Sequence, residues 1–488
     1  MPDENEIIRA VTELTLVNPF SPQRQEVENR FVETTNGKRG GTHEERFAGF
    51  FQWVDSLPAA RRNYRKVPDG ERETMRNLFL FDSYHRYTGR LDDLIAEQVK
   101  RGEAGCVVSF GAECIERMQA HGLSRDEAVR YVGIFYQLRR AHYFIIRGLK
   151  GKSECMFEFR RRLWTSVFTS DVRWYERHLW DRMEDFSTLL LGETGSGKGT
   201  AAAAIGRSGF IPYLPEKREF AESFNRSFVA TNLAEFPETL IEAELFGYRK
   251  GAFTGAVENY SGVFARCSSH GAIFLDEIGE IDHGVQVKLL HVLQDRTFTP
   301  VGSRDVQRFR GRVICATNRS LSELRQKRVF RDDFFYRISS DVITVPSLRQ
   351  RISENAEELD LLLETIVERM VGEKWGEMYE QVRERLRASV GPDYSWPGNV
   401  RELEQAVRRI IVSGSYSPTE ASYGEDVERV FAGASLTAEE LLSRYCERAV
   451  EVHGTRAAAA RKLGLDVRTL TRYLSRTAEA EGLITAST

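Results

Sequence analysis

Short apolar runs alternate with helical stretches in the middle of the chain. After residue 170 the runs STLLLGE, SFVATN, GAIFLDE and RVICATN appear, each bounded by glycine or polar turn residues. Such runs, separated by helical stretches, are typical of a parallel sheet whose strands are joined by crossover helices. The pattern therefore predicts an α/β domain over residues 166–345, followed by a helical stretch to residue 412.

The first 165 residues predict mostly helices, most clearly in LSRDEAVRYVGIFYQLRRAHYFIIRGLKG. Ser124 and Glu127 have the spacing of a helix capping box. The large apolar residues that follow recur at roughly helical spacing: Tyr131, Val132, Phe135, Leu138 and Phe144. This stripe predicts a helix–helix core, with a ligand pocket as the alternative. Strands and helices do not alternate here, so a receiver fold is not expected, and the ligand of this regulatory domain is left open.

The end of the chain divides into a linker and a small helical module. Residues 413–435 lack periodicity and predict a linker, whereas residues 436–488 return to short helices. The expected fold class is multidomain, with a mostly helical N-terminal domain (1–165), an α/β domain with a phosphate-binding loop (166–345), a helical lid (346–412) and a C-terminal all-α module.

Bulk composition sets broad limits. At 488 residues the chain is too long to fold around a single hydrophobic core. Its content of 41% hydrophobic and 29% charged residues is ordinary for a globular protein. No apolar run approaches membrane-spanning length, and the acidic N-terminus MPDENEIIRAV is unlike a secretion signal. Six cysteines without a CxxC pair predict reduced thiols. We therefore expect a cytoplasmic protein without a membrane partner.

The stretch LLLGETGSGKGT places a glycine-rich loop between an apolar strand and an alanine-rich helix, which is the context of a phosphate-binding loop. Lys198 would bring a positive charge to the outer phosphates. The next residue is Gly199, where the general pattern has a serine or threonine that holds magnesium, and Thr200 is an alternative donor. The expected nucleotide-binding residues are Gly192, Glu193, Thr194, Gly195, Ser196, Gly197, Lys198, Gly199 and Thr200.

Two carboxylates end the strand in GAIFLDEIGE. Asp276 can hold Mg²⁺ and Glu277 can polarise an attacking water. Behind a phosphate loop, this pair predicts hydrolysis of a nucleoside triphosphate. Asn318, at the end of RVICATN, is suited to contact the γ-phosphate or its water.

Two further segments carry candidate residues. In FRDDFFYRI, Arg331 and Arg337 could stabilise phosphoryl transfer from a neighbouring subunit, or could be solvated surface charges. In GYRKGAFTGAVE, Phe253 stands among small residues between Gly251 and Gly255, which predicts a mobile apolar tip. An exposed apolar group at a tip indicates a partner-binding site.

The stretch TRAAAARKLGLDVRTLTRYLSR predicts a helix-turn-helix. Residues 457–463 form the first helix, Gly464 allows the turn, and Asp466 caps the second helix. Arg456, Arg461 and Lys462 suit phosphate contacts. The residues expected to face the major groove of DNA are Arg468, Thr469, Arg472 and Tyr473.

Residues from about 170 to 412 resemble the AAA+ domain of bacterial enhancer-binding proteins, the activators of sigma-54 RNA polymerase. The resemblance rests on an intact GAFTGA, on GAIFLDEIGE and on WPGNVREL. It implies ATP and Mg²⁺ as cofactors, and a homo-oligomeric ring, usually a hexamer, that is a dimer when inactive. The C-terminal module resembles the Fis-type DNA-binding domain of this family.

The resemblance also implies residue roles. Lys198 binds phosphate, Asp276 coordinates magnesium and Glu277 is the catalytic base. Asn232 restrains this glutamate until sigma-54 is engaged. Three arginines match the trans-acting fingers and the second sensor: Arg331, Arg337 and Arg401. The loop that engages sigma-54 consists of Gly251, Ala252, Phe253, Thr254, Gly255 and Ala256.

The expected function is therefore a sigma-54-dependent transcriptional activator. It binds upstream enhancer DNA, assembles into an ATP-hydrolysing ring and remodels the closed complex of sigma-54 RNA polymerase holoenzyme to the open complex. The alternatives are a DNA-binding repressor whose ATPase does not activate, and an AAA+ remodeller of another protein.

Overall fold

The computed structural model describes residues 3–474 apart from residues 39, 327–328, 373–374, 392, 419–441, 444, 447–448 and 451–453. The chain divides into two compact units, Met1–Ser415 and Tyr416–Thr488. Most of the predicted linker and the end of the predicted C-terminal domain (residues 475–488) lie outside the described residues.

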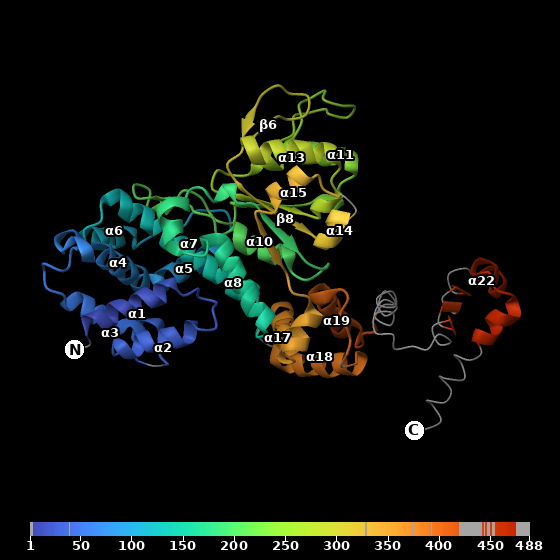
Figure 1. Cartoon of the computed structure of the whole chain (residues 1–488), viewed down its shortest axis with the longest axis horizontal. Coiled ribbons are helices and arrows are strands. Elements are labelled where there is room, and N and C mark those ends of the chain that lie inside the picture. Colours follow the sequence, from blue (N-terminus) through green and yellow to red (C-terminus); the bar gives the residue numbers. More distant parts are fainter. Residues whose placement is uncertain are drawn as a thin grey trace. The chain divides into compact units, whose positions relative to one another are not determined.

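The first part of unit 1 is helical, as predicted (Figure 1). Its helices are α1 (Glu4–Leu16), α2 (Arg24–Thr34), α3 (His43–Ser56), α4 (Arg72–Arg86), α5 (Thr88–Arg101), α6 (Gly111–Ala120), α7 (Arg125–Gly148) and α8 (Glu154–Phe168). The capping box that begins α7 is confirmed, because the Glu127 amide donates to the Ser124 hydroxyl and the Ser124 amide donates to the Glu127 carboxylate.

The aromatic stripe of α7 is core rather than pocket lining. Tyr131, Val132 and Phe135 are buried in one cluster with side chains of α5 and α6, and Leu138 and Phe144 pack against that cluster. The prediction of a helix–helix core is therefore confirmed.

Two histidines pack beside a second cluster, among α1 to α4: His85 is buried and His43 is half-buried. His43 Nε2 lies 3.0 Å from His85 Nδ1, and both rings stack on Phe47. Burial, reinforced by nearby Arg139 and Arg46, lowers the pKa of His43 to about 4. Burial also holds the pKa of His85 well below its ordinary value. Both rings are therefore neutral in the folded protein near pH 7.

We expect this helical region to lose stability as the pH falls from about 6.5 toward 4. The folded-state pKa of His43 lies below the unfolded value, so the unfolded chain binds more protons across this window, and stability present at neutral pH is lost on acidification. Full titration of His43 costs roughly 2–3 kcal/mol. Hydrogen exchange of α3 and α4 amides at pH 7 and pH 5, corrected for intrinsic rates, measures the effect. Helix α18 (Trp375–Ser389) has no histidine and is the internal control. Equal protection of α3 and α4 at both pH values would contradict the expectation.

A five-stranded parallel sheet forms the centre of unit 1. Its order is β4 (Phe228–Asn232), β5 (Ala272–Asp276), β8 (Arg312–Thr317), β1 (Thr188–Leu191) and β9 (Asp341–Thr344). All neighbours pair in parallel. The four predicted apolar runs form β1, β4, β5 and β8, whereas β9 was not predicted.

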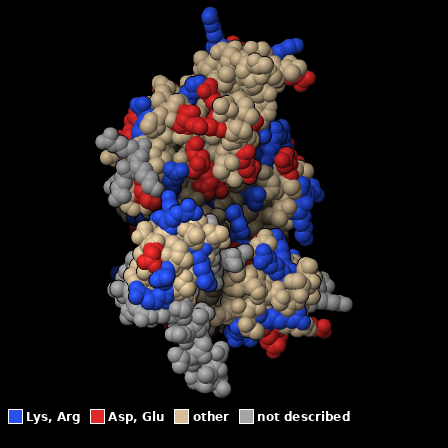
Figure 2. Space-filling view, turned by 90° about the vertical axis from the view of Figure 1, so that its right-hand side faces the viewer, with Lys and Arg blue, Asp and Glu red and all other residues tan. Residues whose placement is uncertain are grey.

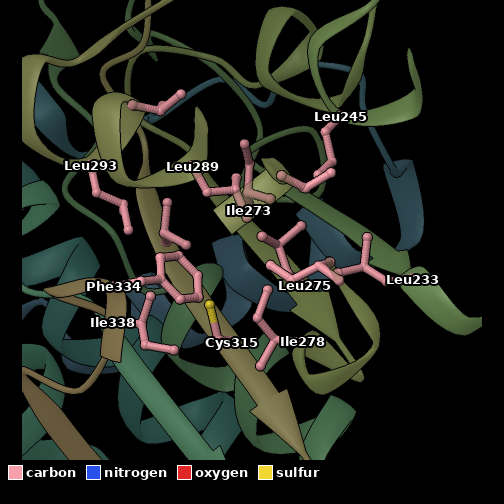
Figure 3. Packing of buried hydrophobic residues seen from close by; sticks show 14 of the residues in the cluster. Leu233, Leu245, Ile273, Leu275, Ile278, Leu289, Leu293, Cys315, Phe334 and Ile338 are labelled. Carbon is pink, nitrogen blue, oxygen red and sulfur yellow. The ribbon is translucent and has the colours of Figure 1, made fainter. Parts of the chain in front are cut away.

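Helices cover both faces of this sheet. One face packs on α11 (Glu238–Phe246), α13 (His283–Asp295) and α15 (Asp332–Ile338), with the buried side chains drawn in Figure 3. The other face packs on α10 (Lys198–Gly206) and on α7 and α8 from the N-terminal region. Burial on both faces explains why the central strands β5, β8 and β1 are mostly apolar, whereas the edge strands β4 and β9 are only partly buried. The N-terminal helices therefore share a core with the sheet.

Smaller elements complete unit 1. They are α9 (Val172–Trp174), the pair β2 (Tyr213–Leu214) and β3 (Glu219–Phe220), α12 (Val263–Arg266), the pair β6 (Thr297–Phe298) and β7 (Gln307–Arg308), α14 (Leu321–Gln326), and the lid helices α16 (Leu348–Glu354), α17 (Glu357–Val371), α18 and α19 (Asn399–Ser413). Acidic and basic side chains are interspersed over the face in Figure 2. Among the residues that the structure describes, no helix is both long enough and apolar enough to cross a bilayer.

Candidate functional site

The loop between β1 and α10 forms a cradle around a buried lysine. Lys198 is 6% exposed, and its Nζ donates to the Gly192 carbonyl (2.9 Å) and the Glu193 carbonyl (3.3 Å). Burial lowers the pKa of Lys198, while Glu277 and Asp276 act in the opposite direction. An ammonium group held inside a loop at a helix N-terminus is suited to bind phosphate. The residues present therefore fit the outer phosphates of a nucleotide.

The acidic pair lies at the carboxyl edge of the sheet, beside this loop. Asp276 is the last residue of β5, and Glu277 follows with φ 53°, in the left-handed region. The Asn318 amide N–H, just after β8, donates to Glu277 Oε2 at 3.4 Å, and Asn318 Nδ2 lies 3.5 Å from Thr194 Oγ1. A non-glycine residue in this backbone region is strained, and such strain is often found at functional sites. Glu277, Asn318 and the phosphate loop thus converge on one edge.

The donor set near Asp276 fits magnesium in part. Mg²⁺ in nucleotide sites uses one or two carboxylates together with phosphates and water. A Cβ added at Gly199 would meet only Phe274 Cε1, at 3.9 Å, so this position is open. The methyl group of Thr200 lies beside Gly148 at the end of α7, and its role as an alternative donor stays a prediction.

Replacing Gly199 with serine is expected to lower the Mg²⁺ concentration needed for half-maximal binding of a fluorescent ATP analogue. A hydroxyl oxygen would add a hard ligand at an open position, and a side chain in the first turn of α10 costs less chain entropy than glycine. Titration of Mg²⁺ against analogue fluorescence measures this, with Gly199→Ala as the matched control. An unchanged Mg²⁺ midpoint in the serine variant would contradict the expectation.

The lid touches the phosphate loop through residues that sequence reasoning did not assign to the site. Asn399 Nδ2 donates to Glu193 Oε2 at 3.0 Å, and Arg349 Nη1 donates to the same oxygen at 2.9 Å. A Cβ added at Gly195 would lie 2.8 Å from the Cβ of Arg401, which puts the predicted second sensor beside the loop. Arg349 carried no motif signal, because its contact spans 156 residues of sequence.

Asn232 lies next to the acidic pair, since it pairs in register with Asp276. Its side-chain oxygen accepts from the Ala234 amide, and its Nδ2 donates to Glu235. The predicted restraint of Glu277 by Asn232 therefore stays a prediction.

The two candidate arginine fingers lie at the two ends of α15, Arg331 at the N-cap and Arg337 in the last turn. Arg331 is exposed and forms an ion pair with Asp333 at 2.9 Å. Arg337 is half-buried and donates to the Leu293 carbonyl in the last turn of α13 at 2.6 Å. Their proposed reach into a neighbouring subunit stays a prediction.

The GAFTGA segment forms a compact exposed loop. The Gly251 amide donates to the Ala256 carbonyl (2.8 Å), and the Ala256 amide donates to the Phe253 carbonyl (3.0 Å). Phe253 is 38% exposed, and its ring packs edge-on against Tyr248 with centroids 4.9 Å apart. Phe253 therefore has one aromatic neighbour and remains accessible at the tip, and its role as a partner-binding group stays a prediction.

The loop between β6 and β7 braces the base of this tip. The Arg249 amide donates to the Val301 carbonyl, and the Val301 amide donates to the Gly247 carbonyl. Arg249 also forms an ion pair with Asp305 at 3.1 Å. A Cβ added at Gly302 would lie 2.7 Å from Ala252 Cβ, so the two loops are in close contact. The base of the tip is thus held by the loop between β6 and β7.

Unit 2 contains the predicted pair of helical segments. Helix α22 (Arg456–Leu463) ends at Gly464, which has φ 68°, and residues 467–474 are helical after Asp466. The Asp466 carboxylate accepts from both the amide and the hydroxyl of Thr469, at 2.8 Å each. A small core joins the segments: Cys446, Ala449, Ala459, Ala460 and Leu470.

Five basic side chains in the described part of unit 2 lie on its surface. The exposed residues are Arg456, Arg461, Lys462, Arg468 and Arg472. Two residues that were predicted to face outward are only partly exposed. Tyr473 is half-buried and packs against the small core, and Thr469 is half-buried because its hydroxyl completes the helix cap.

Known proteins resemble the part of the chain that holds this site. Residues 176–344 match the Sigma-54 interaction domain. The Nif-specific regulatory protein of Azotobacter vinelandii is 40% identical over 46% of this chain and 40% of its own length. An uncharacterised protein in the HyuA 5′ region of Pseudomonas sp. is 34% identical over 49% of this chain and 74% of its own length. The chain belongs to the bacterial enhancer-binding protein family.

The family match covers most of the α/β part of this enhancer-binding protein. It includes the phosphate loop, the acidic pair, the GAFTGA loop and both arginines of α15, and it ends before Arg401 and unit 2. The chain spans less than half the length of the Azotobacter relative and 43% of the NtrC regulator of Azospirillum brasilense, to which it is 37% identical over 46% of this chain. A solved structure of Brucella abortus NtrX in complex with ATP is 20% identical, covering 76% of this chain and 80% of its own, with a TM-score of 0.41.

Proposed function

We propose that this enhancer-binding protein hydrolyses ATP and uses the GAFTGA loop to remodel sigma-54 RNA polymerase from the closed to the open complex. The observation that carries the proposal is the position of the exposed, braced Phe253 on the same α/β unit that holds Lys198 and Glu277. One compact unit thus carries both the proposed nucleotide site and the proposed partner-binding tip.

The protein's own residues supply the hydrolytic chemistry. Lys198 releases the carbonyls of Gly192 and Glu193 and binds the outer phosphates of ATP. Asp276 holds Mg²⁺, which neutralises phosphate charge when it is bound. The Glu277 carboxylate accepts a proton from the attacking water, and Asn318 orients that water or the γ-phosphate.

A homo-oligomeric ring, with the hexamer as the expected size, completes the site. Transition-state charge on the γ-phosphate calls for an arginine, and α15 carries two candidates near the surface. Arg331 gives up its ion pair with Asp333 and binds the nucleotide of the neighbouring subunit. Arg337 gives up its hydrogen bond to the Leu293 carbonyl and binds the same nucleotide. The bound nucleotide then changes the orientation of neighbouring subunits in the ring, and this change raises or lowers the GAFTGA loops. Residues 1–165 regulate this cycle.

Unit 2 binds upstream DNA through its exposed arginines. Arg468 lies in the first turn of the second helical segment, which is the part of a helix-turn-helix that enters the major groove. Arg468→Ala is expected to weaken binding of the cognate enhancer fragment by about tenfold, since one good base contact is worth about 1–3 kcal/mol. Fluorescence anisotropy at fixed salt measures the affinity, and Arg385→Ala, on α18, is the control. Equal affinities for Arg468→Ala and the unaltered chain would contradict the assignment.

The proposed function is tested by trapping its intermediate. The full chain is mixed with purified sigma-54 and ADP–aluminium fluoride, and the products are separated by gel filtration. We expect a stable complex that is absent with ADP alone. Sigma-54 that elutes free in both mixtures would overturn the proposal and would favour the remodeller of a different partner.

A further inference from the structure

The short lid helix α16 has polar contacts on two sides. Toward the phosphate loop, Arg349 forms an ion pair with Glu193, which Asn399 of α19 also holds. Toward the N-terminal region, Arg351 Nη2 donates to the Lys150 carbonyl at 2.7 Å. One seven-residue helix therefore touches both the nucleotide loop and the connection between α7 and α8.

A buried carboxylate anchors the second side. Glu358 of α17 is fully buried, and Arg351, which is 4% exposed, donates to it from Nε (2.9 Å) and Nη2 (2.6 Å). Glu358 also accepts the backbone N–H groups of Ser153 (2.6 Å) and Lys152. Nearby, Glu354 of α16 accepts the Cys155 amide at 2.7 Å. Residues 150–155 are thus bonded to α16 and α17 by three backbone N–H donors and by the Lys150 carbonyl, which accepts from Arg351.

The electrostatics of this anchor favour a fixed geometry. Burial acts to raise the pKa of Glu358, but Arg351 and the backbone donors outweigh it and lower the pKa. The carboxylate is therefore ionised and compensated inside the protein. Separating Arg351 from Glu358 would leave a buried charge without its partner, which is strongly unfavourable. Residues 150–155, α16 and α17 are therefore expected to move together.

We propose that α16 is a positioning element that links the docking of residues 150–155 to the geometry of the phosphate loop, through Arg351 and Glu358 on one side and Arg349 and Glu193 on the other. The inference deepens the proposed function, since it rests on ATP binding at this loop. A change in how the N-terminal helices hold this segment shifts α16, and with it the ion pair that fixes Glu193. Nucleotide affinity is thereby regulated from the N-terminal region.

Substitution of Ser153 by proline or by alanine distinguishes the role of its backbone N–H from that of its side chain. Ser153 precedes α8 with φ −72° and makes no capping bond with its side chain, so proline fits its backbone angle. Ser153→Pro removes the N–H that Glu358 accepts, and Ser153→Ala keeps it. Because hydrogen bonds to charged groups are the stronger ones, we expect Ser153→Pro to speed hydrogen exchange of residues 192–197 by about tenfold. We also expect a weaker affinity for a fluorescent ATP analogue and a raised KM with little change in kcat, whereas Ser153→Ala resembles the unaltered chain.

A double variant tests the link itself. Arg349→Gln removes the direct ion pair of α16 with Glu193 and leaves the bond from the Leu348 amide to Asn399 in place. It is expected to cause the same changes, and adding Ser153→Pro to it should cause a further change smaller than Ser153→Pro causes alone. Glu354→Ala, at a surface carboxylate, should act in the same direction and keeps the test available if the proline variant does not fold. Additive effects, or unchanged exchange at residues 192–197 in the Ser153→Pro and Glu354→Ala chains, would overturn the inference. Failure of the unaltered chain to bind the analogue would instead count against the proposed function, because the exchange comparison needs no nucleotide.

Discussion

Replacing Glu277 with glutamine is expected to lower ATP hydrolysis by about 10²–10⁴-fold, the usual contribution of a general base, while ATP binding persists. Glutamine has nearly the same shape, can still accept the amide of Asn318, and cannot take the proton of the attacking water. Because the phosphate loop and Lys198 are untouched, binding energy from the phosphates remains. Steady-state phosphate release and fluorescent-analogue binding are the two measurements.

The control for this substitution is Glu280→Gln. Glu280 is a nearby carboxylate whose partner is Arg319, at 2.8 Å, on the surface. Its loss is expected to leave turnover close to that of the unaltered chain, since exposed ion pairs contribute little. Turnover retained in Glu277→Gln, or lost equally in both variants, would remove Glu277 from the role of base.

Replacing Phe253 with alanine is expected to abolish open-complex formation while ATP turnover continues. The ring lies on the braced loop and contacts Tyr248, whereas the nucleotide residues lie at the carboxyl edge of the sheet. Removing it therefore takes away apolar contact with the partner and leaves the hydrolytic residues in place. Buried aromatic anchors at interfaces are commonly worth about 2 kcal/mol or more. Promoter melting and phosphate release are measured on the same preparation.

A matched aromatic residue serves as the control for the tip. Phe157 of α8 is also 38% exposed, and its ring lies near the guanidinium of Arg160. Phe157→Ala is expected to leave both activities unchanged. Promoter melting that survives in the Phe253→Ala chain would exclude the tip as the gripping element.

The sequence could predict those features that depend on neighbours along the chain. The four long apolar runs became strands, and Ser124 with Glu127 capped α7 as their spacing required. The phosphate loop was readable because glycines, a lysine and a following helix occur in one stretch. Strand β9 was missed because its sequence, DVIT, begins with a charged residue and ends with a polar one, and so contains no continuous apolar run like that of β1.

Features that depend on residues far apart in the sequence could not be predicted in the same way. The ion pair of Arg349 with Glu193 joins residues 156 positions apart. Likewise, the packing of α7 and α8 on the sheet followed from no local pattern, because any apolar helix face can cover either a helix or a sheet. Tyr473 was expected to face outward, yet one half-buried ring is needed to close the small core of unit 2.

The central claim is that hydrolysis by this unit drives the opening of a sigma-54 promoter. The most direct measurement follows promoter melting by permanganate reactivity, with the full chain, sigma-54 holoenzyme and either ATP or a non-hydrolysable ATP analogue. We predict melting with ATP and a closed promoter with the analogue. Melting with the analogue, or a promoter that stays closed while ATP is being hydrolysed, would contradict the account.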